Sequence, residues 1–288
     1  MAYNGQLSLE EMVIVIDALD AQYEIDVHLE GGEALLSEDL PQLLARIPER
    51  VWEKITVTTS GALKLKFKAH LLRQVGDLRV SVEGAGAEHY AMRGIQLSSL
   101  EAFMVELKAE DVRFSIRSTL FAQNVRAWPK MVQYALRVGA SRLSCYELQP
   151  VGRANETAAE YFLSPSDVDE FINSLLDSEC SGLPLRCVFQ FSERRCAAIQ
   201  RRAEVLDAAG WNVQMLADIP SLTINANGEI GISPWKITAR QVNDRIGNVR
   251  DPSWLTMLRK AYRNGVLHDD SASTSRIRIS SKMHHVNT

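Results

Sequence analysis

Gly31, Gly32 and Glu33 are the residues of this chain whose types and spacing best suit ligand chemistry. They directly follow a segment of alternating apolar and polar residues, so they stand where a predicted strand ends. Two residues without side chains let a ligand approach the backbone closely, and the following carboxylate accepts hydrogen bonds from an ammonium group. Alone, this tripeptide is more typical of a turn followed by a carboxylate at a helix start. The elements around it therefore decide its meaning.

Helical and strand patterns alternate along the first half of the chain. Expected helices occupy residues 7–22, 37–46, 63–74, 98–108 and 127–138, and expected strands occupy residues 23–30, 54–59, 77–82, 112–119 and 142–148. Strands separated by helices of about 10–15 residues predict right-handed βαβ crossovers and a parallel α/β sheet, either barrel-like or doubly wound. In such sheets ligands gather at the carboxyl ends of the strands.

The segments that follow these strands are rich in glycine and small hydroxyl side chains. They are residues 31–33, 58–61, 81–84, 124 and 149–154. Together they predict a polar rim that exposes its backbone and suits a small zwitterionic or ribose-bearing ligand.

Four of these segments, together with Arg93-Gly94, look in their order like the radical S-adenosylmethionine (SAM) superfamily. The resemblance covers about residues 7–154 and rests on Gly-Gly-Glu at 31–33, T-x-G at 59–61, S-V-E-G at 81–84, Arg-Gly at 93–94 and P-V-G-R-A at 150–154. It implies an α/β fold, a partial (β/α)6 TIM-like barrel that binds SAM.

Residue by residue, the resemblance implies a SAM-binding set. Gly31, Gly32 and Glu33 match the segment that meets the methionine amino group. Ser81 and Arg93 match the serine and arginine that contact the ribose and the carboxylate. Adenine contacts in the family come from the last two strand ends, which here lie near two further residues, Asn124 and Leu148.

The chain departs from the family pattern most strongly in its cysteines. The family's C-x-x-x-C-x-x-C loop, whose thiolates hold a 4Fe-4S cluster, precedes the helix matched by residues 7–22, and only residues 1–6 stand there. The first barrel strand is also missing, so we expect a barrel without it and no metal ligands. The four cysteines, at positions 145, 180, 187 and 196, do not replace the loop by their spacing, and cluster chemistry requires such thiolates. No catalytic residue can be assigned, although Cys145, Tyr146 and Glu147 near the last barrel strand are candidates.

The C-terminal third predicts a further strand at 185–191, a helix at 193–209 and a hairpin at 221–232 around Asn227-Gly228. The hairpin resembles the opening of a SPASM or twitch extension, which carries auxiliary clusters, but Ser233 stands at one ligand position. We therefore predict a barrel at 1–212, a small α+β extension at 213–266 and a disordered tail at 267–288.

Composition excludes several classes of protein. The 288 residues carry a formal charge of −4, which gives no electrostatic footprint for nucleic acid. No apolar run approaches the roughly 18 residues of a membrane helix, and no signal peptide begins the chain, so we expect no membrane partner and a cytoplasmic location.

Two functional classes follow. In the first, the chain comes from a lineage that modifies a peptide or small natural product by SAM-derived radical chemistry, is shortened at its N-terminus, and is inactive as it stands. In the second, the gene begins here and encodes a cluster-free relative that binds a partner protein, a peptide or a nucleotide. Loss of the auxiliary cysteines favours the second class, whereas the exposed edge of strand 23–30 favours a shortened chain or a partner.

Overall fold

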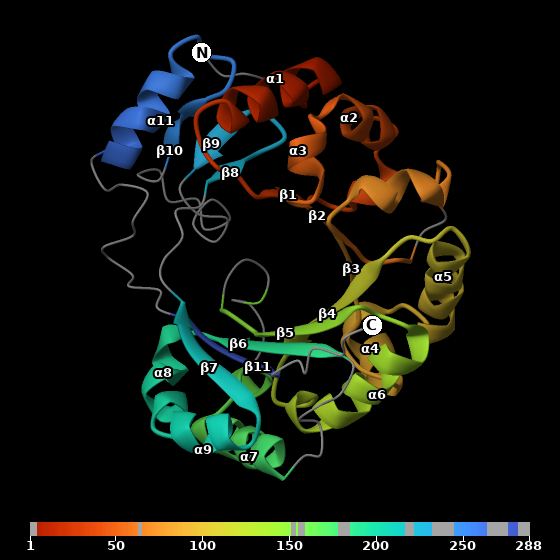
Figure 1. Ribbon diagram of the computed structural model, residues 1–288, viewed down its shortest axis with the longest axis vertical. Coiled ribbons are helices and arrows are strands. Elements are labelled where there is room, and N and C mark those ends of the chain that lie inside the picture. Colours follow the sequence, from red (N-terminus) through yellow and green to blue (C-terminus); the bar gives the residue numbers. More distant parts are fainter. Residues whose placement is uncertain are drawn as a thin grey trace.

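The structure is a computed structural model that describes residues 5–62, 65–150, 154, 159–177, 185–216, 222–231, 245–263 and 276–281. Its main feature is an eight-stranded sheet of order β1-β2-β3-β4-β5-β6-β11-β7. The strands are β1 (Val27–Leu29), β2 (Ile55–Thr59), β3 (Asp77–Ser81), β4 (Phe114–Leu120), β5 (Arg142–Glu147), β6 (Arg186–Phe191), β7 (Trp211–Leu216) and β11 (Arg276–Ser281). Strands β1 to β6 pair in parallel. Figure 1 shows this sheet curving through the molecule with helices on its outer side. The predicted partial TIM-like barrel is therefore confirmed.

Helices connect and cover these strands. They are α1 (Leu9–Asp20), α2 (Leu40–Arg46), α3 (Glu49–Trp52), α4 (Ala87–Arg93), α5 (Leu97–Ala109), α6 (Trp128–Val138), α7 (Pro165–Leu176), α8 (Glu193–Gln200), α9 (Ala203–Ala208) and α11 (Trp254–Arg263). Short 3-10 helices lie at Ala34–Leu36, Ala69–Gln74, Val125–Ala127 and Ala159–Tyr161. Apolar side chains of the strands and helices form one continuous core, in which Val57, Leu78 and Ile116 are fully buried on neighbouring strands. Polar residues alternate with the apolar ones in these strands, and several of them, including Thr56, Ser115 and Ser144, are buried as well.

A small second sheet, the C-terminal extension, packs on α1. Its strands β8 (Thr223–Ile224), β9 (Glu229–Gly231) and β10 (Arg245–Asn248) are antiparallel, and the hairpin turns at Asn227-Gly228 as the sequence predicts. Gly228 has φ +82°, a left-handed conformation that favours glycine. Trp254 and Leu258 of α11 pack against Val15 and Leu19 of α1, so α11 and the first helix of the chain share one small core.

Several local expectations need correction. The tail is not disordered at residues 276–281, because β11 inserts antiparallel between β6 and β7 and hydrogen-bonds to both. Arg and Ile alternate in this segment, which is a strand pattern. The two strands with which it pairs, β6 and β7, lie far away in the sequence. The predicted boundary at residue 212 falls inside β7, which belongs to the main sheet. Other parts of the tail lie outside the described residues.

The expected helix at 193–209 is two helices, α8 and α9, and the expected helix at 63–74 is a 3-10 helix from Ala69 to Gln74. Strand β1 covers only three residues of the expected strand at 23–30.

Within the described residues, no helix is long and apolar enough to cross a membrane.

Candidate functional site: a polar cleft at the strand ends

The carboxyl ends of strands β1 to β4 surround a cleft of about 280 Å³, here called the strand-end cleft. Its lining residues are Glu30, Gly31, Gly32, Glu33, Thr58, Thr59, Ser60, Ser81, Glu83, Arg93, Arg117 and Thr119. Parallel strands bring their carboxyl ends to one edge of the sheet, which is why segments far apart in sequence meet here. The lining holds carboxylates, guanidinium groups and hydroxyls together, as a zwitterionic ligand requires.

Glu33 joins the ends of β1 and β2. Its Oε2 accepts hydrogen bonds from the backbone N of Ser60 at 2.8 Å and from the Ser60 hydroxyl at 2.7 Å. Its Oε1 accepts from the backbone N of Leu35 at 3.2 Å, so the carboxylate also caps the short helix that begins at Ala34. These bonds hold the carboxylate in place while it still lines the cleft. A preorganised acceptor of this kind suits an ammonium group.

The glycines leave the space beside the backbone open. A Cβ atom added at Gly31 or Gly32 meets no atom within 4 Å, so the backbone there is accessible to a ligand. Gly61 has a different role, because its φ is +64° and a Cβ would lie 2.8 Å from the Leu100 side chain. It lets the chain turn sharply after β2 beneath the cleft.

Arg93 reaches the cleft through an ion pair with Glu83. Its Nε and Nη2 donate to Oε1 of Glu83 at 3.0 and 2.5 Å. The Glu83 carboxylate is only 5% exposed, and its Oε2 accepts from the backbone N of Thr119 at 2.6 Å. Glu83 therefore ties the loop after β3 to β4 and orients the guanidinium. Ser81 lies beside them, buried, on the same lining.

The other two predicted ligand residues lie outside the strand-end cleft. Asn124 is buried, accepts from the backbone N of Phe121 at 2.9 Å, and donates to the carbonyls of Glu83 and Thr119 at 3.0 and 2.7 Å. Its amide thus braces the loop that carries Glu83. The backbone N of Leu148 donates to the carbonyl of Leu120, and its side chain does not line the cleft. Their adenine contacts remain a prediction.

Sequence reasoning missed the roles of Ser60, Glu83 and Arg117. Ser60 and Glu83 stand just beyond strand ends, which was a signal in the sequence, whereas Arg117 lies in the middle of β4. The partners of all three residues are distant in the sequence. Arg117 of β4 donates to Glu30 at 3.2 Å and lies over the Tyr146 ring, 5.1 Å from its centroid. It gives the cleft a second guanidinium.

A separate buried network surrounds Glu147 at the end of β5. This carboxylate accepts from the backbone N and the hydroxyl of Ser192 at 2.9 and 2.6 Å, and from Arg194 and Arg195 at 2.8 and 3.0 Å. Burial opposes its ionisation, but the hydrogen bonds from Ser192 and the two guanidinium groups outweigh burial and lower its pKa. The arrangement holds the ends of β5 and β6 together.

The cysteines of the described residues do not form a cluster site. Cys145, Cys187 and Cys196 are buried in the apolar core, and burial raises the pKa of Cys145 well above its usual range. Across the described ranges, no three His, Cys, Asp or Glu side chains gather as a metal site would require. Cys180 lies outside those ranges. A 4Fe-4S cluster, which needs thiolates, therefore does not fit this part of the chain.

No family model matches the chain. Curated relatives do match it. The PqqA peptide cyclase of Granulibacter bethesdensis is 26% identical over 153 residues, which is 51% of this chain and 40% of that protein. The AdoMet-dependent heme synthase of Oleidesulfovibrio alaskensis is 26% identical over 181 residues, 61% of this chain and 46% of that protein. The chain thus spans less than half the length of these relatives.

Solved structures share the fold. Streptococcus suis SuiB bound to the precursor peptide SuiA has a TM-score of 0.68 and 12% identity, over 91% of this chain and 60% of SuiB. The enzyme anSMEcpe with bound AdoMet has a TM-score of 0.59 and 16% identity, over 90% of this chain and 73% of that chain. These likenesses show the fold of a partial TIM-like barrel. The chain is a homologue of radical SAM superfamily proteins.

Proposed function

We propose that the strand-end cleft binds SAM by its methionine end. The observation that carries this proposal is the meeting of Glu33 with the Glu83–Arg93 pair in one cleft beside an open glycine backbone. SAM carries an ammonium and a carboxylate on the same carbon atom, so it requires an anionic and a cationic partner close together. Glu33 supplies the first and Arg93 the second.

The fixed bonds within the cleft leave groups for the ligand. Among the described residues, Glu83 engages Nε and Nη2 of Arg93, which leaves Nη1 for the ligand carboxylate. Ser60 and Leu35 hold Glu33 in place, so little side-chain entropy is lost when an ammonium group binds. Ser81 offers its hydroxyl on the same lining, as a ribose contact would require.

We further propose a peptide or small natural product as the substrate of the lineage. One relative is a peptide cyclase, and one structural neighbour was solved with its precursor peptide. SAM supplies radical chemistry in this superfamily only with a cluster, and the described residues of this chain do not fit one. No radical step is therefore assigned to them. A cluster-free binding protein is the second candidate, and the buried state of Cys145, Cys187 and Cys196 favours it.

Isothermal titration calorimetry of this chain with SAM tests the binding proposal. We expect Glu33→Gln and Arg93→Gln each to weaken binding about tenfold or more, since each removes one charge-assisted contact worth about 1.5–3 kcal/mol. Glu38→Gln is the matched control, because Glu38 pairs with Lys66 on the surface and does not line the cleft. Equal affinities for all four proteins would refute the assignment.

Anaerobic iron–sulfide reconstitution separates the two candidates. If the chain binds SAM but develops no 4Fe-4S absorbance, the cluster-free candidate is supported for the chain as given. A stoichiometric cluster on this chain would show that cysteines outside or within the core rearrange to bind iron. It would refute our conclusion that the chain does not fit a 4Fe-4S cluster.

A further inference from the structure

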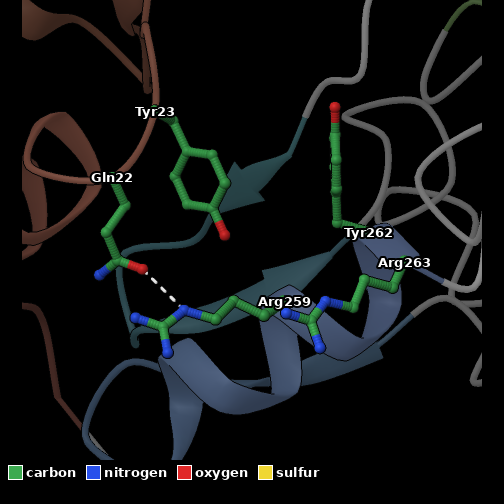
Figure 2. Close-up of a pocket in the computed structure, with 5 residues that line it drawn as sticks. All are labelled: Gln22, Tyr23, Arg259, Tyr262 and Arg263. Atoms are coloured by element: carbon green, nitrogen blue, oxygen red, sulfur yellow. Dashed lines mark hydrogen bonds between the residues drawn. The ribbon is translucent and has the colours of Figure 1, made fainter.

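A second cleft, of about 300 Å³, lies between the end of α1 and the last turns of α11 (Figure 2). We call it the α1–α11 cleft. Its lining residues are Gln22, Tyr23, Arg259, Tyr262 and Arg263. Gln22 and Tyr23 precede β1 and the other three residues belong to α11, and among the described residues the two clefts share none. The α1–α11 cleft is therefore a separate feature of the surface.

Hydrogen bonds fix one wall of this cleft. The side-chain amide of Gln22 donates to the carbonyl of Ala18 at 3.2 Å and accepts from Nε of Arg259 at 2.8 Å. The last turn of α1 thus holds the Arg259 side chain against it. Nε of Arg259 is engaged by Gln22, and the planar guanidinium group carries further N–H donors in a fork that matches a carboxylate.

The described lining of the cleft carries two positive charges. Arg259 and Arg263 stand four residues apart on one face of α11, and Figure 2 shows both side chains running in the same direction along the helix. Like charges at this spacing destabilise a helix. Among the described residues, no carboxylate lines the cleft, and Glu24, next to Tyr23, pairs with Lys54 at 3.2 Å. An anion between the two guanidinium groups would relieve this repulsion.

The other wall is aromatic. Tyr23 and Tyr262 face one another with ring centroids 6.2 Å apart and planes inclined at 52°, and Tyr262 is 47% exposed. Aromatic faces beside a guanidinium pair suit the planar and apolar groups of a polypeptide. The net charge of −4 and the small number of cations disfavour a nucleic acid as occupant.

We propose that the α1–α11 cleft binds an acidic peptide segment. A glutamate or aspartate carboxylate of that peptide lies against Arg259 and Arg263, and a neighbouring residue packs on Tyr23 and Tyr262. Peptide binding at this site does not depend on SAM binding, so this proposal can be tested separately from the proposed function of the strand-end cleft.

Fluorescence anisotropy with labelled hexaglutamate and hexaglutamine peptides tests the site. We expect saturable binding of hexaglutamate that weakens as sodium chloride rises, and at least tenfold weaker binding of hexaglutamine. Arg263→Gln should weaken hexaglutamate binding at least tenfold. Lys260→Gln is the matched control, because Lys260 carries the same charge on the same helix but does not line the cleft, and it should change binding less than twofold.

Three results would overturn the proposal: no binding of hexaglutamate, equal losses in Arg263→Gln and Lys260→Gln, or displacement by inorganic phosphate well beyond that by sodium chloride of equal ionic strength. The last would identify a phosphate site instead of a peptide site. Thermal melts followed by circular dichroism confirm that each variant is folded. The Arg263→Gln protein should bind SAM as the parent does, which separates this test from that of the strand-end cleft.

Discussion

The ion pair between Glu83 and Arg93 should be one of the strongest side-chain couplings in the molecule. Arg93 donates two charge-assisted hydrogen bonds, of 3.0 and 2.5 Å, to a carboxylate that is 5% exposed. Such bonds contribute about 1.5–3 kcal/mol each, and the 32% exposure of Arg93 screens the pair, so we expect a coupling of about 2 kcal/mol. Glu83→Gln alone should cost more, about 3–4 kcal/mol, because Arg93 is then left without its counter-charge.

A double-mutant cycle in urea measures this coupling. The four proteins are the parent, Glu83→Gln, Arg93→Gln and the double variant, and the free energy of unfolding is compared at constant m-value. The control cycle uses Glu30 and Arg117, a pair 3.2 Å apart with side chains 51% and 31% exposed, for which we expect about 0–1 kcal/mol. A coupling for Glu83 and Arg93 below about 0.5 kcal/mol, or no larger than the control, contradicts the reasoning.

Three further predictions concern stability. Ser8→Ala should cost about 1 kcal/mol in urea unfolding, because Ser8 and Glu11 form a capping box at the start of α1, and an unchanged midpoint would show that the cap contributes nothing. A hydrogen bond from Arg250 is the main reason that the pKa of Glu11 falls from 4.5 to about 2. The folded pKa is depressed, so this stabilisation is complete above pH 4.5 and is lost as the pH falls towards 2; Glu11→Gln should flatten that part of the stability curve. Phe171→Ala should cost about 3–5 kcal/mol, because Phe171 is fully buried and packs edge-on against Trp128 at 6.0 Å; a loss under 1 kcal/mol would mean that the core closes around the cavity.

Local patterns predicted the elements of the barrel well. The capped start of α1 at Ser8, the strand from Asp77 to Ser81 and the turn at Asn227-Gly228 all follow from short-range rules of capping, alternation and turn formation. These rules work because the free energies involved depend on residues only a few positions apart. The shortness of β1 and the break between α8 and α9 depend on packing, and they differed from expectation.

The strand-end cleft was predicted in part. Gly31, Gly32, Glu33, Ser81 and Arg93 do meet in one lining, because the alternation of helices and strands brings parallel strand ends to one edge. Asn124 instead braces a loop, since its amide is used by three backbone groups. No spacing rule indicates in advance whether an amide at a strand end faces a ligand or the backbone.

The order of the residues alone predicts a parallel α/β fold that resembles the radical SAM barrel and a glycine-lined turn after β1. Tertiary packing alone decides that residues 276–281 complete the sheet beside β6, that Glu83 holds Arg93, and that the ends of α1 and α11 form a cationic cleft. The physical reason is the range of the interactions. Periodicity, caps and turns are set by neighbours in the chain, whereas strand insertion, buried ion pairs and clefts depend on residues brought together from up to hundreds of positions apart.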